Sequence, residues 1–331
     1  MAPYILGFDL GGTKVSAAVF DGDNHIIDRA RAKSRAWREQ EEVFKTIVQV
    51  GHKAIERSGI SADKIAAVGI GTPGPLDPDT GYIIESGNLS FRNFPLGPRL
   101  SEEFGCPAVI DNDVNVGTFG EFKAGAASDA KDALGIFVGT GIGGGIIIDG
   151  KLYHGFSKNA AEVGHMVVKI DGPRCGCGRR GCLESLASRV AITRDIRKAV
   201  KEGHKTQLAK VAEKKNEIIP SNALKKAYKD GDKVAVRVLD EAARYIGIGI
   251  GSLVNVLGPE VIVLGGGVVE AMSDDFVARI ERAARRVAFD FAIKGVRFVR
   301  AELGDDAGMV GAAMLARQLL MKRASPKKRK K

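Results

Sequence analysis

The chain has 331 residues, 44% hydrophobic and 27% charged, which is ordinary for a soluble globular protein and long enough for two domains with separate cores. Its net charge of +10 is concentrated in the last ten residues, KRASPKKRKK, and the remainder has 43 basic against 40 acidic residues, so we do not expect a nucleic-acid-binding body. No apolar run reaches 18 residues, and three of the four cysteines lie within eight residues, which excludes a membrane span and a disulfide scaffold and favours a cytoplasmic protein.

An internal repeat opens the chain. LGFDLGGTKVSAAVFDG at residues 6–22 aligns without a gap with LGIFVGTGIGGGIIIDG at residues 134–150. Each copy predicts a strand, a glycine-rich turn, a second strand and an Asp-Gly turn into a third strand. A helix-period segment and an apolar strand follow each copy, at residues 65–71 and 260–265.

The repeat predicts two related α/β domains, each of which presents a glycine turn toward the gap between them. Glycines there allow backbone N–H groups to approach an anion, and a phosphate chain is the expected ligand. DLGGTK, from Asp9 to Lys14, resembles the actin-like superfamily of sugar kinases and chaperone ATPases. Dinucleotide-binding and Walker interpretations fail, because a strand follows the glycines of residues 139–144 and Leu152 stands where a Ser or Thr is required.

Between the copies, GTPGP at residues 71–75 predicts a rigid turn, and NLSF at residues 88–91 suits a saccharide-binding loop or a plain surface loop. The segment DNDVN at residues 111–115 follows a short buried strand. A carboxylate at that end of a strand can accept the proton of an attacking hydroxyl. The same letters are equally typical of a helix N-cap, and both interpretations stay open.

A cysteine-rich stretch, EVGHMVVKIDGPRCGCGRRGCLES, occupies residues 162–185. One imidazole and three thiolates, from His165, Cys175, Cys177 and Cys182, make a complete tetrahedral zinc set with no open position, so a structural metal is expected. A redox site is disfavoured because the C-x-x-C spacing is absent. Glu162 and Glu184 flank the stretch, either as partners that orient the imidazole or as ligands of polyol hydroxyls.

Taken together, DLGGTK, GTPGP, NLSF, DNDVN, GTGIGGG, EVGH, CGCGRRGCLE and LGGGV occur in the order found in the ROK family of sugar kinases and repressors, which the chain resembles along nearly its whole length. The resemblance is strongest to the bacterial glucokinases of that family. It implies ATP-dependent phosphorylation of a hexose at its 6-hydroxyl, with glucose favoured over N-acetylglucosamine, N-acetylmannosamine, fructose or mannose.

The resemblance also implies roles for individual residues. Asp113 is the expected general base, and the sugar is expected to contact Asn88, Asn112, Asp113, Glu162, His165 and Glu184. ATP and Mg²⁺ are expected at Asp9, Gly11, Gly12, Thr13, Lys14, Thr140, Gly141, Gly143, Gly265, Gly266 and Gly267. His165 would face the sugar and also bind the structural Zn²⁺ with Cys175, Cys177 and Cys182.

The expected architecture has two actin-like (ribonuclease H-like) α/β domains flanking a nucleotide and sugar cleft. Residues 1–116 form the small domain, completed by a C-terminal helix at 306–321, and residues 117–305 form the large domain with the zinc loop at 165–182. Residues 322–331 are expected to be a disordered basic tail. A homodimer or homotetramer is expected.

Two other functions were weighed against a kinase. A sugar-sensing ROK repressor is disfavoured because the first predicted strand starts at Tyr4, which leaves no room for an N-terminal helix-turn-helix. A sugar-binding protein without catalysis is disfavoured by Asp113 and the paired glycine turns. Polyphosphate remains an alternative phosphoryl donor to ATP.

Overall fold

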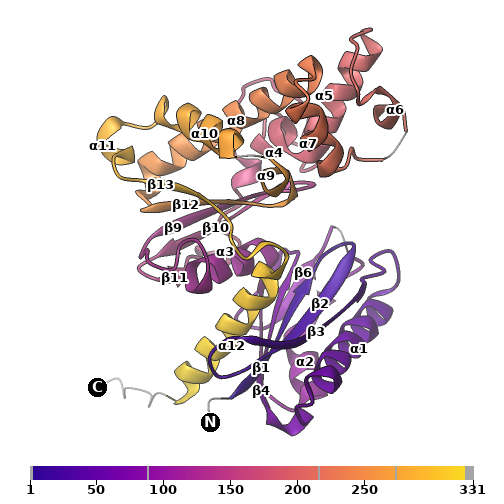
Figure 1. The fold of residues 1–331 in the computed structure, drawn as a ribbon. Helices are drawn as coiled ribbons and strands as arrows, with labels where there is room; N and C mark the ends of the chain where they lie inside the picture. The colour runs from indigo at the N-terminus through magenta and orange to yellow at the C-terminus, as the bar shows by residue number, and fades with distance from the viewer. Residues whose placement is uncertain (1–2, 88, 215–216, 273, 325–331) are drawn as a thin grey trace. The chain divides into compact units, whose positions relative to one another are not determined.

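The computed structural model describes residues 3–324 apart from 88, 215–216 and 273, and its chain divides into two compact units. Unit 1 comprises Met1–Ser128, Leu152–Ala160 and Asp305–Lys331, and unit 2 comprises Asp129–Lys151 and Ala161–Gly304. Figure 1 shows the ribbon of both units. No helix among the described residues is both long enough and apolar enough to cross a membrane.

Unit 1 is built on a five-stranded sheet with the order β3-β2-β1-β4-β8. Its strands are β1 (Tyr4–Leu10), β2 (Lys14–Phe20), β3 (Ile26–Lys33), β4 (Ile65–Thr72) and β8 (Ala108–Asn112). The first three pair antiparallel, and β4 and β8 continue the sheet in parallel with β1. A smaller sheet contains β5 (Leu76–Asp77), β6 (Tyr82–Glu85) and β7 (Arg92–Phe94).

The helices of unit 1 are α1 (Gln40–Ser58), α2 (Leu96–Phe104), α3 (Asp113–Ala124) and α12 (Ala307–Ala324), with short 3₁₀ turns η1 (Ala62–Lys64) and η3 (Gly304–Asp306). The apolar residues of α1 recur at helical spacing, and Val43, Ile47, Val50 and Ala54 are buried. The helix ends at Gly59, whose positive φ of 68° is the left-handed conformation that glycine adopts without strain.

The C-terminal helix α12 packs against the sheet of unit 1, although about 300 residues separate it from β1. It lies beside β1 and β4 in Figure 1, where it is drawn in yellow. Gly69 in β4 makes this approach possible, because a Cβ at that position would overlap the backbone of Ala312. α12 also packs on α3, so that both helices cover one face of the sheet.

Unit 2 repeats the same strand order as β11-β10-β9-β12-β13. Its strands are β9 (Ala133–Val138), β10 (Ile142–Ile148), β11 (Lys151–Leu152), β12 (Val261–Gly265) and β13 (Arg297–Arg300). β9 pairs antiparallel with β10 and parallel with β12, as β1 does with β2 and β4. The internal repeat predicted from the sequence is thereby confirmed, because β2 and β10 occupy positions 128 residues apart.

The helices of unit 2 cover its sheet and surround a separate apolar core. They are η2 (Val163–His165), α4 (Leu183–Ala187), α5 (Arg189–Lys201), α6 (Ala209–Ala212), α7 (Ser221–Lys229), α8 (Lys233–Leu257), α9 (Gly267–Ala271), α10 (Asp274–Arg285) and α11 (Asp290–Ile293). The long helix α8 buries one face from Val234 to Val254 and packs against α10.

The compact units follow other limits than the expected domains at two places. A boundary after residue 116 would cut α3, which stays whole because it packs along α12. The segment Leu152–Ala160 belongs to unit 1 although the residues on both sides belong to unit 2. Two ion pairs link it to other residues of unit 1, His154 with Asp111 and Lys158 with Asp79. In addition, α12 extends to Ala324, three residues into the predicted tail, whose remaining residues 325–331 lie outside the described residues.

Candidate functional site

Three consecutive polar residues at the carboxyl end of β8 differ in position and in contacts. Asp111 is buried, Asn112 is the N-cap of α3, and Asp113 is the first residue of that helix. The Asn112 side-chain oxygen accepts hydrogen bonds from the N–H groups of Val114 and Asn115, at 2.9 and 3.2 Å. The helix-cap interpretation therefore holds for Asn112, while Asp113 lies in the first turn, where the helix dipole favours a carboxylate.

The buried Asp111 pairs with the partly exposed His154, in the segment that returns to unit 1. Its Oδ2 lies 2.6 Å from His154 Nε2, and its Oδ1 accepts the Asn115 amide at 3.0 Å and the Asn112 N–H at 2.8 Å. The hydrogen bond to Asp111 raises the pKa of His154, against the opposing effect of burial. The pair thus fixes both the end of β8 and the segment that leads to Glu162 and His165.

His154→Ala is expected to lower the free energy of unfolding by about 1.5–3 kcal/mol, because Asp111 loses a charged hydrogen-bond partner. Since the folded-state pKa of His154 is raised, its contribution is complete below the unfolded-state value near 6.5 and is lost as the pH rises through the folded-state value. Urea unfolding across this range should show that pH dependence in the wild type and not in His154→Ala. Identical pH profiles in the two proteins would contradict the pairing.

The first glycine turn joins β1 to β2 through Leu10–Lys14. It is closed by a hydrogen bond from the Gly11 N–H to the Lys14 carbonyl at 2.9 Å, and the Thr13 carbonyl accepts the Ser34 N–H. Gly12 lies between them on the exposed part of the turn. The turn lies at the end of the β1–β2 hairpin and leads into Lys14, whose Nζ is 3.0 Å from Asp305.

Asp9 precedes this turn and faces the start of α12. A Cβ at Gly308 would lie 2.7 Å from the Asp9 carboxyl carbon, which places the carboxyl against the first turn of that helix. Burial raises the pKa of Asp9 to about 6, and Lys14 partly opposes the shift. A carboxylate held at such a position gains from a nearby cation, which is compatible with the expected magnesium role.

Asp9→Asn is expected to stabilise the protein at neutral pH in the absence of magnesium and nucleotide. Because the folded-state pKa is raised, the folded protein binds the extra proton between about pH 4 and 6, and stability falls as the pH rises through that window. The gain is at most about 3 kcal/mol. Urea denaturation at pH 4.5 and 7.5 measures it, and an equal stability of both proteins at pH 7.5 would argue against a buried charge.

The second glycine turn, residues 139–143, is held from outside by the helices that follow the cysteine stretch. Glu184 Oε2 accepts the Ile142 N–H at 3.0 Å. A Cβ at Gly141 would overlap the same Oε2, so a larger residue there would displace the Glu184 carboxylate from its contact with the Ile142 N–H. Thr140 and Gly143 flank this contact, so the predicted phosphate turn and a predicted sugar ligand lie together.

The cysteine stretch folds into one cluster. The ligand atoms of His165, Cys175, Cys177 and Cys182 all lie within 4.8 Å of one another, with Cys175 Sγ 3.6 Å from His165 Nδ1 and Cys177 Sγ 3.7 Å from Cys182 Sγ. A tetrahedral zinc ion with Zn–S near about 2.3 Å places sulfurs about 3.8 Å apart and a sulfur and an imidazole nitrogen about 3.5 Å apart. The cluster fits that ion through the Nδ1 atom of His165.

The two acidic residues that flank the stretch take different positions. Glu184 Oε1 lies 3.8 Å from Cys175 Sγ, so this carboxylate links the cluster to the second glycine turn. Glu162 Oε2 lies 3.9 Å from His165 Nε2, the nitrogen that faces away from the sulfurs. That distance exceeds a direct hydrogen bond, and a hydroxyl between the two groups could bond to both.

The three cluster thiols differ in acidity. The exposed Cys177 accepts a hydrogen bond from the Arg179 backbone, which lowers its pKa to about 7. Burial raises the pKa of Cys175, and it raises that of Cys182 to about 12. A metal must therefore displace protons from Cys175 and Cys182 at neutral pH, while Cys177 is already largely ionised above pH 7.

A third glycine segment follows β12. Gly265 ends the strand, Gly266 has a positive φ of 83°, and Gly267 opens α9. Ser221, at the start of α7, lies next to this segment, because a Cβ on Gly267 would be 3.6 Å from its Oγ. Asn88, the remaining predicted sugar ligand, lies outside the described residues.

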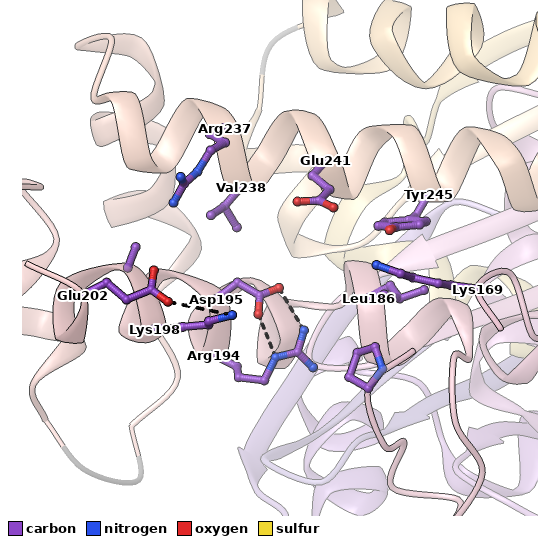
Figure 2. Close-up of a pocket in the computed structure, with 12 residues that line it drawn as sticks. Lys169, Leu186, Arg194, Asp195, Lys198, Glu202, Arg237, Val238, Glu241 and Tyr245 are labelled. Atoms are coloured by element: carbon purple, nitrogen blue, oxygen red, sulfur yellow. Dashed lines mark hydrogen bonds and ion pairs between the residues drawn. The ribbon is translucent and has the colours of Figure 1, made fainter. Parts of the chain in front are cut away.

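A separate pocket of about 530 Å³ in unit 2 is lined by residues of α5 and α8 together with Lys169, Pro173 and Leu186, and does not include the predicted site residues (Figure 2). Four of its charged side chains pair with one another: Arg194 makes two 2.8 Å contacts with Asp195, and Lys198 lies 3.8 Å from Glu202. Lys169, Arg237 and Glu241 are the other charged residues of the lining.

Among the described residues, unit 1 contains Asp9, the first glycine turn, Asn112 and Asp113, and unit 2 contains the second and third glycine segments, the metal cluster, Glu162 and Glu184. Sequence reasoning missed His154 and Arg189, which contact Asp111 and Thr140. The signals were slight: a histidine after a short strand, and an arginine directly after the Ser188 helix cap.

The chain matches the profile of one protein family, the ROK family, over residues 5–319. The chain belongs to this family. A ROK relative, the glucokinase of Halalkalibacterium halodurans, is 34% identical over 95% of this chain and 95% of its own length. The xylose repressor of Caldicellulosiruptor bescii is 29% identical over 96% of this chain and 79% of the repressor.

A solved ROK structure agrees in fold. The glucokinase of Streptomyces griseus, crystallised with glucose and AMPPNP, is 33% identical and superposes with a TM-score of 0.80 over 95% of this chain and 99% of the other. This match and the doubled strand order confirm the expected pair of actin-like α/β domains. The family contains both kinases and repressors, so its name alone leaves the reaction open.

Proposed function

We propose that this protein is an ATP-dependent hexose kinase that phosphorylates the 6-hydroxyl, with glucose as its preferred acceptor. The observation that carries the proposal is the placement of Asp113 at the carboxyl end of β8 in a chain 33% identical to a glucokinase crystallised with glucose and AMPPNP. The proposed sugar ligands are Asn112 and Asp113 in unit 1 and Glu162, His165 and Glu184 in unit 2.

In this mechanism Asp113 accepts the proton of the sugar hydroxyl as its oxygen attacks the γ-phosphorus. The bond between the γ-phosphorus and the β,γ-bridging oxygen breaks, and ADP leaves with its electron pair. The Asn112 side-chain oxygen caps α3, and its amide nitrogen is proposed to donate to the sugar. Glu162 and His165 Nε2 bind one sugar hydroxyl between them. Glu184 accepts from another sugar hydroxyl and also holds the Ile142 N–H of the second glycine turn.

The nucleotide is proposed to lie along the three glycine segments. Gly11, Gly12, Thr13 and Lys14 in unit 1 and Thr140, Gly141 and Gly143 in unit 2 bind phosphates, while Gly265, Gly266 and Gly267 lie beside the adenosine. Asp9 is the residue proposed to hold Mg²⁺, which would supply neutralisation of phosphate charge. His165, Cys175, Cys177 and Cys182 would hold zinc in a structural role, and Cys175 contacts Glu184.

A coupled assay of ADP release over a sugar panel tests the proposal. Glucose should give the highest kcat/KM, above N-acetylglucosamine, N-acetylmannosamine, mannose and fructose, and ATP should exceed polyphosphate as donor. If another sugar of the panel gave the highest kcat/KM, the protein would be a kinase for that sugar and not a glucokinase. If no hexose were phosphorylated, the kinase proposal would be wrong.

The similarity to a xylose repressor favours one second candidate, a sugar-responsive regulator. It predicts sugar binding without turnover and sugar-dependent DNA binding, which an electrophoretic mobility assay separates from kinase activity. We favour the kinase because Asp113 and the paired glycine turns serve phosphoryl transfer. A cytoplasmic homodimer or homotetramer is part of the proposal, and light scattering with size exclusion measures the assembly.

A further inference from the structure

Arg189 is fastened to the second glycine turn by its backbone. It is the first residue of α5, and its N–H donates to the Gly139 carbonyl at 3.0 Å. The next residue, Val190, donates to the Thr140 carbonyl at 3.4 Å. These backbone hydrogen bonds hold Arg189 against the second glycine turn independently of its side chain.

The guanidinium of Arg189 contacts two hydroxyls. Nη2 donates to Thr140 Oγ1 at 3.1 Å and Nη1 to Ser221 Oγ at 3.2 Å. Nε is buried without a hydrogen-bond partner, and in the described part of the chain no ion pair involves this side chain. The guanidinium therefore has only neutral partners in the described part of the chain, and an anionic group of a ligand would be a stronger partner for its two Nη groups.

The position of Arg189 lies between two parts of the proposed nucleotide site. Thr140 belongs to the turn that is expected to hold phosphates, and Ser221 lies against Gly267, in the segment expected beside the adenosine. Arg189 thus contacts the turn proposed to hold phosphates and also Ser221, which lies next to the segment proposed beside the adenosine. All of these contacts lie within unit 2.

We propose that Arg189 binds the phosphate chain of the nucleotide. The inference rests on the proposed kinase function and adds to it a cationic ligand that the sequence motifs do not include. A guanidinium presents its donors in a fork that matches phosphate oxygens. When a phosphate replaces the Thr140 and Ser221 hydroxyls as its acceptor, each hydroxyl can rotate and bond to water or to another protein group. Arg194, on the same helix, is already paired with Asp195 (Figure 2).

Calorimetric titration of the full-length, zinc-containing protein with ATP, ADP and adenosine tests the proposal. Arg189→Gln should weaken ATP and ADP binding by about 10–100-fold and leave adenosine binding within about twofold. Arg189→Lys should recover part of the loss, because it retains the charge and loses the fork. Arg194→Gln is the matched control and should bind all three ligands as the wild type does.

Other results would overturn the assignment. ATP affinity within twofold of wild type in Arg189→Gln removes Arg189 from the phosphate site while leaving the kinase proposal intact. Equal weakening of ATP and adenosine means that Arg189 only shapes the turn. A wild-type protein that binds neither ATP nor ADP ends both proposals. Zinc content and melting temperature are measured on each variant, and Arg189→Lys decides the matter if Arg189→Gln unfolds.

Discussion

Asp113→Asn is expected to lower kcat by a factor of about 10²–10⁴, while the dissociation constant for glucose stays within a few-fold of wild type. The amide has the shape of the carboxylate and can still accept from the Val114 N–H, which lies 3.0 Å from Asp113 Oδ1. It cannot take a proton from the attacking hydroxyl. Single-turnover kinetics at saturating sugar measure the chemical step, and calorimetry measures sugar binding.

The control for this prediction is Asp63→Asn, which removes an exposed carboxylate of unit 1 on η1. It should leave kcat and glucose binding unchanged. Substantial residual turnover in Asp113→Asn would refute its role as the base. An equal loss of glucose binding would instead assign Asp113 to sugar recognition, with proton removal left to another group.

The fold was predictable because its evidence is local and repeated. Two copies of strand, glycine turn and strand, 128 residues apart, occupy equivalent places in the two sheets. Each hairpin is specified by apolar alternation and an Asp-Gly turn within about 17 residues. The metal cluster was predictable for the same reason, because its four ligands are of distinctive types and close in sequence.

The roles within DNDVN could not be read from the sequence. Asp and Asn serve as helix caps, buried ion-pair partners and catalytic groups with the same side-chain atoms. Only the fold assigns Asp111 to His154, Asn112 to the first turn of α3, and Asp113 to the position after the cap. Burial and long-range partners decide between these uses, and neither is a local property.

The two contacting residues that sequence reasoning missed depend on long-range packing. His154 meets Asp111 from 43 residues away, and Arg189 meets Thr140 from 49 residues away. The first segment of unit 1 ends at Ser128 and not at residue 116 for a similar reason, because α3 packs on α12, near the other end of the chain. Such contacts follow from tertiary structure and have no signature in spacing or composition.

Cys177→Ser is expected to abolish stoichiometric zinc binding and to weaken glucose and ATP binding together. A serine hydroxyl is a poor zinc ligand, so the cluster loses one of its four ligands. His165 and Glu184 then lose the support that fixes them, and Glu184 also holds the Ile142 N–H in the second glycine turn. Elemental analysis measures zinc, and calorimetry measures both ligands.

Cys106→Ser is the matched control, because Cys106 is a buried thiol of unit 1 outside the cluster. It should retain zinc and both ligand affinities. Unchanged zinc content in Cys177→Ser would contradict the cluster as a metal site. Loss of zinc with full retention of glucose and ATP binding would show instead that the metal stabilises the loop without supporting the site.

The acidity of the thiols adds a quantitative test on the wild-type protein. Burial keeps Cys175 and Cys182 protonated at neutral pH, whereas the pKa of Cys177 is about 7. Zinc binding should therefore release about three thiol protons per ion well below pH 7 and about two above it. Calorimetry in buffers of different ionisation enthalpy counts these protons, and a release that does not change between pH 6 and 8 would mean that Cys177 does not titrate near pH 7 in the metal-free protein.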